Sequence, residues 1–324
     1  MSNNSSLISD NFNTDDIEEV NHFLTTIPTV LIILMCPIII FTNVLTITAI
    51  RKFYYLQTPA NMYVLCLSCA DLLLGISMLF CTFRVFNPKV LNFEGDATEK
   101  NSCLICLGMM VGSAAVSYLT LTAMAVDRLI AVTRPFLYER YFSLKVVRFN
   151  IVLLWILGFI GMTVICTHDS WEPGKACHLS KTLQRLMLSI FLFIPCIILT
   201  LIISGSYARI IFTVRQQQQR ITIQNNAILS SDVLMEQKRQ ASLKLAKTML
   251  TVYGVLLLCY TPFIIVTLLQ AVLGNDHFGL LIFNKYADVL VSCNSFINAL
   301  IYGWRMPDFR RAYKQLLCGQ CRTM

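Results

Sequence analysis

Seven long apolar stretches constrain the fold of this 324-residue chain more than any other feature. A helix needs about 20 largely apolar residues to cross the hydrocarbon core of a membrane. Alternating segments of about ten residues, typical of membrane β-barrels, are not visible. The pattern therefore predicts an all-α membrane protein, a bundle of seven transmembrane helices within residues 23–304. The expected spans are 23–50, 62–83, 103–133, 150–166, 186–214, 242–273 and 281–302.

Composition supports a membrane protein and excludes two other classes. The chain is 56% hydrophobic and 14% charged, whereas a soluble domain carries about 25% charged residues. A soluble enzyme of this size would need more charge to cover its surface, and a disordered chain would hold far fewer large hydrophobic residues.

The basic residues predict how the chain is oriented in the membrane. Of the 26 Lys and Arg residues, the seven-span arrangement puts 19 on the side of the first, third and fifth connections between spans and the C-terminus. Positively charged connections stay cytoplasmic, so we expect a multi-pass plasma-membrane protein with an extracellular N-terminus. The net charge of +8 then faces lipid head groups, and a nucleic-acid partner is disfavoured. The other seven are Arg84, Lys89, Lys100, Lys175, Lys181, Arg185 and Lys285.

The two ends of the chain carry candidate modification sites. Residues 1–22 form a polar, acidic tail in which Asn3 and Asn4 begin glycosylation triplets. Residues 305–324 predict a short amphipathic eighth helix and a cytoplasmic tail. Cys318 and Cys321 follow that helix and are candidates for palmitoylation, with two reduced thiols as the alternative.

Isolated polar residues inside the spans form a recognisable series. The series comprises Asn43; Leu67 to Leu72 with Asp71; Asp127-Arg128-Leu129; Trp155; Cys259-Tyr260-Thr261-Pro262; Asn298 to Tyr302; and Asp308 to Arg311. In the order and spacing of these residues, the chain resembles the class A (rhodopsin-like) G-protein-coupled receptors over residues 23–321. The resemblance implies a receptor that binds an extracellular ligand and activates a heterotrimeric G protein, with no enzymatic activity of its own.

The resemblance assigns roles at the cytoplasmic side and in the helix core. Asp127 neutralises Arg128 at rest, and Arg128 reaches the G protein when helices part. The alternative is an arginine that merely extends to the head groups from a helix end. Phe136 resembles the exposed anchor for the G protein. Tyr207 and Tyr302 belong to the same switch, while Tyr260, Pro262 and Asn298 belong to the activation core.

The resemblance implies two further features, an ion site and a disulfide bond. Asp71, Ser117, Asn294 and Asn298 resemble an allosteric sodium site, because a hard cation prefers oxygen ligands. A water-filled polar cluster without an ion is the alternative. A Cys103–Cys177 disulfide would tether the loop before the fifth span, with Cys106 and Cys166 as rival partners.

Several residues depart from the family pattern. Tyr260 stands in place of the usual Trp, and Ala299 replaces the usual Pro of the seventh span. Ser242 stands where many relatives carry a Glu that locks the third-span arginine. We therefore expect appreciable basal signalling, unless Glu236 substitutes for that carboxylate.

The sequence excludes some classes of ligand without identifying one. Met110 stands where amine receptors have Asp and Ser292 where opsins have Lys, so a monoamine and retinal are disfavoured. Peptide, small metabolite and lipid stay open. Asp288 either binds a ligand cation or pairs within the protein, with Lys285 available nearby. The candidate pocket comprises Met110, Ser113, Tyr260, Phe263, Thr267 and Asp288.

A channel or transporter is the main alternative to a receptor. It would show a polar stripe along a span or paired broken helices. The polar residues here gather instead at mid-membrane and at the cytoplasmic mouth. Arrestin is a further candidate partner, and its phosphorylated sites would be Thr222, Ser230 and Ser231, because the tail offers few hydroxyls.

Overall fold

The computed structural model describes residues 14–86, 96–167, 194–223, 230–273 and 278–319, and within them all regular structure is helical. This confirms the all-α prediction. In chain order the elements are α1 (Thr14–Lys52), the 3₁₀ turn η1 (Tyr54–Leu56), α2 (Pro59–Phe86), α3 (Asp96–Thr133), α4 (Pro135–Tyr141), α5 (Leu144–Thr167), α8 (Ile194–Ile223), α9 (Ser230–Leu273), α10 (Phe278–Arg305) and α11 (Pro307–Leu317).

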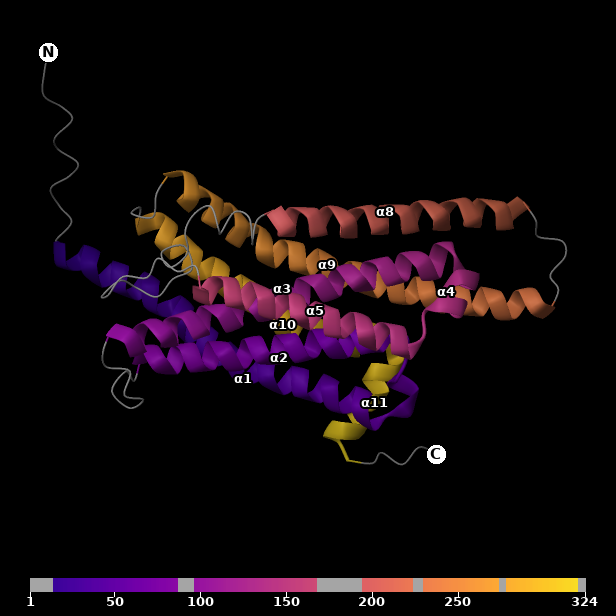
Figure 1. Ribbon diagram of the computed structural model, residues 1–324, viewed down its shortest axis with the longest axis horizontal. Helices are drawn as coiled ribbons and strands as arrows, with labels where there is room; N and C mark the ends of the chain where they lie inside the picture. The colour runs from indigo at the N-terminus through magenta and orange to yellow at the C-terminus, as the bar shows by residue number, and fades with distance from the viewer. Residues whose placement is uncertain (1–13, 87–95, 168–193, 224–229, 274–277, 320–324) are drawn as a thin grey trace, which may run out of the picture.

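Seven long helices run side by side as one bundle (Figure 1). Six of them are long and apolar enough to span a membrane: α1, α2, α3, α5, α8 and α9. The seventh, α10, has 28 residues, which also suffices in length. It is less apolar because it carries buried polar side chains such as Asn284, Asn294 and Asn298. The seven-helix prediction is confirmed.

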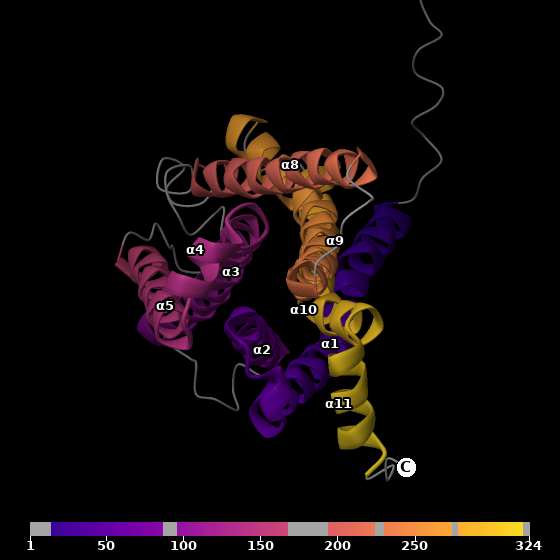
Figure 2. The ribbon, with the colours of Figure 1, turned by 90° about the vertical axis from the view of Figure 1, so that its right-hand side faces the viewer.

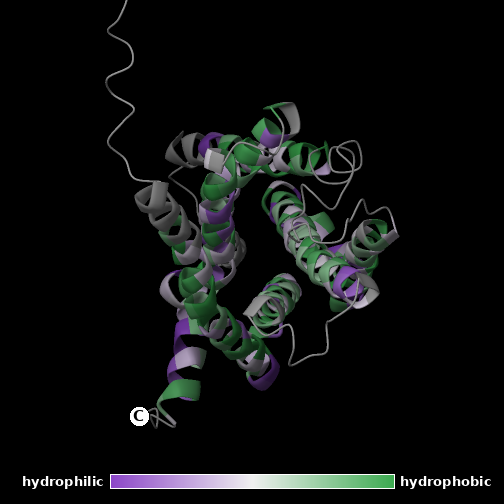
Figure 3. Ribbon diagram, turned by 90° about the vertical axis from the view of Figure 1, so that its left-hand side faces the viewer, coloured by the Kyte–Doolittle hydropathy of each residue, from purple (hydrophilic) through white to green (hydrophobic). Residues whose placement is uncertain are grey.

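Apolar side chains face outward, and polar ones gather inside. Only 17% of the α5 span and 22% of the α8 span is buried. Exposed side chains on these helices include Phe149, Phe159 and Leu201. Hydrocarbon is the solvent that such a surface fits. Figure 3 shows hydrophobic residues along the long helices and hydrophilic ones in α11.

Small residues allow α3 and α5 to pack closely. A Cβ atom at Gly112 would lie 3.2 Å from the carbonyl oxygen of Gly158, and one at Gly158 would overlap the side chain of Val116. In lipid no hydrophobic force drives helices together, because the lipid tails are as apolar as the helix surfaces. Close backbone contact of this kind is then a main source of helix association.

Short elements close the end of the bundle that the basic residues predict to be cytoplasmic. Figure 2 looks at this end and shows α4 beside α3, with α11 extending away from α10. α11 is the predicted amphipathic eighth helix: its Phe309 and Ala312 are buried, whereas Asp308, Arg310 and Arg311 are exposed. The Arg310 Nε donates to the Gly303 carbonyl at 3.1 Å, which fixes α11 against the end of α10.

Several helices extend beyond the expected spans. α1 already begins at Thr14, inside the segment expected as a tail, and α9 begins at Ser230. α8 continues to Ile223, nine residues beyond the expected end of the fifth span at residue 214. The expected fifth span began at residue 186, but residues 168–193 lie outside the described part of the chain.

Candidate functional site

A buried arginine lies near the C-terminal end of α3. Arg128 is 5% exposed and Asp127 is 1% exposed. The Arg128 Nε donates to the Asp127 Oδ2 at 2.8 Å, and its Nη2 donates to the same oxygen. Asp127 is the only acid among the described residues that forms an ion pair with Arg128. The structure thus brings the two residues together as the resemblance implied.

Tyr138 of α4 is a second partner of Arg128. The Arg128 Nη2 donates to the Tyr138 hydroxyl at 2.8 Å, and the guanidinium lies 5.5 Å from the centre of the tyrosine ring. Burial raises the pKa of Tyr138 to about 12, although the neighbouring Arg128 charge lowers it, so the phenol stays neutral. Sequence reasoning missed Tyr138. The signal in the sequence is Pro135, because proline is common at the first position of a helix. A helix that begins there places Tyr138 one turn after Arg134.

A fully buried carboxylate lies at the centre of the bundle. Asp71 of α2 accepts a hydrogen bond from the Ser117 hydroxyl at 3.2 Å and another from the Asn298 amide at 3.0 Å. The cluster therefore joins α2, α3 and α10. Asn43 of α1 donates to the Ser295 carbonyl at 3.0 Å in the same layer.

Two amide oxygens of this cluster lack a partner. The Oδ1 atoms of Asn294 and Asn298 are buried and accept no hydrogen bond from any described residue. An unpaired buried oxygen costs free energy, and such atoms call for an explanation such as a water molecule or an ion. A carboxylate, a hydroxyl and amide oxygens form a donor set that fits a hard cation.

A chain of aromatic side chains connects this layer to α8 and α9. The Tyr118 and Thr200 hydroxyls are hydrogen-bonded at 2.6 Å, and the Tyr118 ring packs edge-on against Tyr260 at 6.0 Å. Nearer the cytoplasm, Tyr207 stacks on Tyr253 at 6.0 Å. Pro262 lies inside α9, two residues after Tyr260.

Tyr302 packs on Phe309 at the junction of α10 and α11. It is fully buried, and its hydroxyl has no partner among the described residues. Tyr207 and Tyr302, which the resemblance assigns to the switch, are both buried, and neither forms a hydrogen bond with Arg128.

The expected ligand-pocket residues come from three helices. Ser113 and Thr267 are buried, and their hydroxyls donate to carbonyls of their own helices. Met110 packs against the group Cys36, Leu74 and Met78. Asp288 is partly buried, and its carboxylate forms no hydrogen bond with a described residue. Tyr260 and Phe263 are partly buried on α9.

The outer ends of α2 and α3 are joined by a disulfide, Cys81–Cys106. This bond is not predicted from the sequence, which points to Cys106 only as a rival in the Cys103–Cys177 pairing and does not point to Cys81 as a partner. Cys106 is therefore not a rival partner for Cys103 or Cys177, and the Cys166 Sγ donates to the Leu104 carbonyl at 3.7 Å. Cys103 is itself disulfide-bonded. Its expected partner Cys177 lies outside the described residues.

The remaining expected sites lie at the surface or outside the described residues. Phe136 of α4 is 75% exposed, which suits a contact with another protein. Cys318 directly follows α11 and is exposed. Asn3, Asn4 and Cys321 lie outside the described part of the chain.

Comparison with known proteins decides the family. A family model described as "7 transmembrane receptor (rhodopsin family)" matches residues 42–302, from the span that holds Asn43 to Tyr302. The chain belongs to the rhodopsin family of seven-transmembrane receptors. It is a class A G-protein-coupled receptor, and this family consists of signalling receptors, not enzymes.

Individual relatives are similar along most of the chain. Lysophosphatidic acid receptor 2 of Homo sapiens is 28% identical over 291 residues, which cover 88% of this chain and 78% of the relative. Trace amine-associated receptor 7h of Rattus norvegicus is 28% identical, with 86% and 78% covered. Trace amine-associated receptor 9 of the same species is 28% identical, with 87% and 84% covered.

Proposed function

We propose that this receptor sits in the plasma membrane with its N-terminus outside and activates a heterotrimeric G protein through Arg128. The observation that carries the proposal is the buried Arg128, held by Asp127 and Tyr138 beside the exposed Phe136. When the cytoplasmic helix ends separate, Arg128 can exchange Tyr138 for an acceptor on the G protein. Phe136 then packs into an apolar site on that partner.

A nucleotide-exchange assay without ligand tests this proposal. Full-length receptor in membranes is combined with a panel of G proteins, and wild type is compared with Arg128→Ala and Phe136→Ala. We expect both variants to lose most of the exchange above background. Tyr54→Ala is the control, because Tyr54 is 88% exposed in η1 and tests whether any exposed aromatic residue suffices. The proposal is contradicted if neither wild type nor Arg128→Ala raises nucleotide exchange above background on any G protein of the panel.

Signalling without ligand follows from the weaker contacts that hold Arg128 in the resting state. Ser242 carries no charge where many relatives have Glu. A hydrogen bond from Arg128 to a neutral phenol is weaker than a charge-assisted contact with a second carboxylate. The resting state therefore loses part of its stabilisation, and we propose that the unliganded receptor signals appreciably.

A sodium ion at Asp71 is the proposed allosteric ligand. Asp71, Ser117, Asn294 and Asn298 would hold it, and its charge would compensate the buried carboxylate. Bound sodium would stabilise the arrangement in which α2, α3 and α10 are drawn together. The unpaired Oδ1 atoms of Asn294 and Asn298 support this proposal.

The ligand site lies between α3, α9 and α10, on the extracellular side of Asp71. The relatives' names describe a lipid receptor and trace-amine receptors. In this chain Met110 leaves no α3 carboxylate for an amine, so we propose that Asp288 of α10 is the acid that contacts a ligand. Asp288→Asn should weaken activation by a cationic ligand and leave ligand-independent exchange unchanged.

Several further features complete the proposal. Glycans at Asn3 and Asn4 would face outward, and palmitoyl groups on Cys318 and Cys321 would anchor the end of α11 in the membrane. A Cys103–Cys177 bond would hold the outer loop over the ligand site. Arrestin binding would depend on phosphorylation of Thr222, Ser230 and Ser231. No role involves a nucleic acid or a resident organic cofactor.

A further inference from the structure

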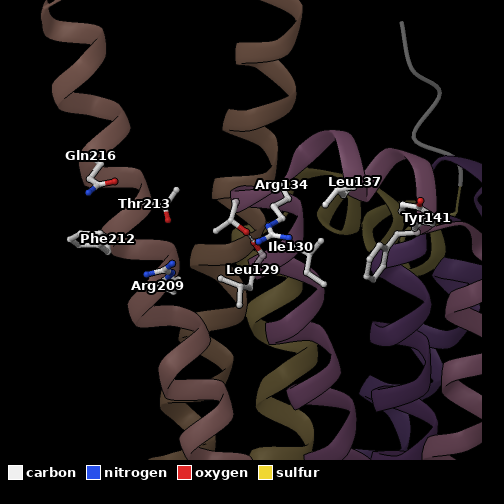
Figure 4. A pocket seen from close by; sticks show the side chains of 11 residues that line it. Leu129, Ile130, Arg134, Leu137, Tyr141, Arg209, Phe212, Thr213 and Gln216 are labelled. Atoms are coloured by element: carbon white, nitrogen blue, oxygen red, sulfur yellow. Dashed lines mark hydrogen bonds between the residues drawn. The ribbon is translucent and has the colours of Figure 1, made fainter.

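A hollow of about 710 Å³ opens at the cytoplasmic ends of α3 and α8, where α4 forms its third side (Figure 4). None of the switch residues Asp127, Arg128 and Tyr302 lines it. The hollow is therefore separate from the central polar network and from the sites assigned above.

The ends of the spans place this hollow at the depth of lipid head groups. The apolar span of α3 ends at Thr133, and that of α8 ends at Gln216. Both residues line the hollow. Arg209 lies seven residues before Gln216, about 10 Å deeper along the helix, and its long side chain can extend toward the head groups.

Two arginines supply the charge of this site. Arg134, at the end of α3, and Arg209, on α8, line the hollow from opposite sides (Figure 4). Both are exposed, and neither side chain forms a hydrogen bond or ion pair with any residue that the structure describes. Thr213 and Gln216 add a hydroxyl and an amide from α8. The polar part of the hollow thus offers donors to an anion.

The rest of the lining is apolar. Phe212, Leu137 and Tyr141 are 54%, 41% and 56% exposed and line the same hollow. A free inorganic anion would leave these side chains uncovered. A molecule with an anionic head and a hydrocarbon chain would satisfy both the arginines and the apolar wall.

We propose that this hollow is a binding site for an anionic phospholipid of the cytoplasmic leaflet. The lipid phosphate lies between Arg134 and Arg209, and one acyl chain follows Phe212 along the outer face of α8. The cytoplasmic leaflet is rich in such lipids, which favours this occupant over a soluble anion. A zwitterionic phosphatidylcholine brings a choline cation with its phosphate, so the two arginines disfavour it.

Binding of acyl-labelled phosphatidylserine to purified full-length receptor in neutral detergent tests the proposal. Phosphatidylcholine with the same chains and label is the reference lipid. We expect wild type to prefer phosphatidylserine and the Arg134→Gln/Arg209→Gln double variant to bind it at least about tenfold more weakly, as expected for the loss of charge-assisted hydrogen bonds. Arg215→Gln is the matched control, an exposed arginine on α8 that does not line the hollow. It should bind like wild type.

A second variant separates lost binding from misfolding. Arg134→Lys/Arg209→Lys keeps both charges without the two-pronged guanidinium geometry and should bind with intermediate affinity. Unchanged phosphatidylserine binding by the Gln double variant overturns the proposal, and so does an equal loss in Arg215→Gln. It is also overturned if the Gln double variant loses G-protein activation in phosphatidylcholine bilayers free of anionic lipid, because the hollow is then a G-protein contact.

Discussion

Tyr138 shows how one side chain can replace a missing charge. Relatives with a Glu at the position of Ser242 can hold the third-span arginine from the sixth span. Here the second contact of Arg128 comes from α4, through a neutral phenol at 2.8 Å. The resting contact is therefore made within the α3–α4 segment, and separating α9 from α3 does not by itself break it.

Removing the Tyr138 hydroxyl should raise basal signalling. Tyr138→Phe keeps the ring but loses the acceptor for Arg128, and a hydrogen bond to a charged group contributes about 1.5–3 kcal/mol. Part of that free energy stabilises the resting state, so ligand-independent nucleotide exchange should rise several-fold, up to about tenfold. Tyr141→Phe, an exposed tyrosine of the same helix, is the control. Ligand-independent nucleotide exchange that is no higher in Tyr138→Phe than in wild type would refute the idea.

Asp71 should make thermal stability depend on sodium. A ligand that binds only the folded state raises stability with its concentration, by about 2.7 kcal/mol at 100 times its dissociation constant. The unfolding temperature of the purified receptor should therefore be higher in NaCl than in choline chloride of equal strength. Asp71→Asn should abolish this difference, whereas Asp308→Asn, an exposed acid on α11, should retain it. A sodium effect that persists in Asp71→Asn assigns the ion to another site.

At the scale of elements, two kinds of contact join neighbouring helices: close backbone packing and a disulfide bond. Glycines let the backbones of α3 and α5 approach closely, and a disulfide joins the outer ends of α2 and α3. Both kinds of contact involve α3, which also packs against α8 and α9. α3 is thus the helix on which the positions of its neighbours depend.

Gly158 and Gly161 form a matched pair on α5. A Cβ at Gly158 would overlap Val116, whereas one at Gly161 meets nothing within 4 Å. Forcing extra volume into a packed interface costs about 1–3 kcal/mol, so Gly158→Ala should lower the unfolding temperature. Gly161→Ala should be neutral or stabilising by up to about 1 kcal/mol, because alanine is the better helix former. Equal effects of the two changes would argue against a close α3–α5 contact.

Loss of the Cys81–Cys106 bond should destabilise the outer half of the bundle. The bond closes a segment of 25 residues, and cross-links of this loop length contribute about 3 kcal/mol. Cys81→Ser/Cys106→Ser should therefore unfold at a temperature several degrees lower, as measured with a thiol-reactive dye. Cys293→Ser, which removes a free thiol, serves as the control. Peptide mapping that finds Cys81 or Cys106 reduced in the native receptor would contradict the bond.

At the scale of the whole molecule, polarity is inverted relative to a soluble protein. Aliphatic and aromatic side chains cover α5 and α8, while Asp71, Asp127 and Arg128 are buried. Buried charges of this kind are costly and persist where they serve a function.

Orientation can be tested on intact cells. The excess of basic residues at the end that carries α4 and α11 predicts that this end is cytoplasmic. An epitope placed before Met1 should be detected on intact cells, whereas one placed after Met324 should need permeabilised cells. The reverse pattern, or equal access to both, would contradict the orientation and with it the assignment of Phe136 and Arg128 to G-protein coupling.

The sequence by itself determined the seven helices, and it also predicts the orientation and the functional layers. Each span needs only a long apolar run to form, because a helix satisfies its own backbone hydrogen bonds in lipid. The same local logic predicted α11 from its amphipathic residues and the Asp127–Arg128 pair from their adjacency. Asp71 stood out because a charge within an apolar run is expensive.

Contacts between distant segments were decided only by the tertiary structure. The Tyr138 contact depends on how α4 folds back under α3, and Cys81–Cys106 depends on the relative height of α2 and α3. The hollow with Arg134 and Arg209 arises from the separation of α3 and α8 at their cytoplasmic ends. Apolar spans have no periodic charge pattern that fixes rotation or height, so packing and interhelical hydrogen bonds must choose them.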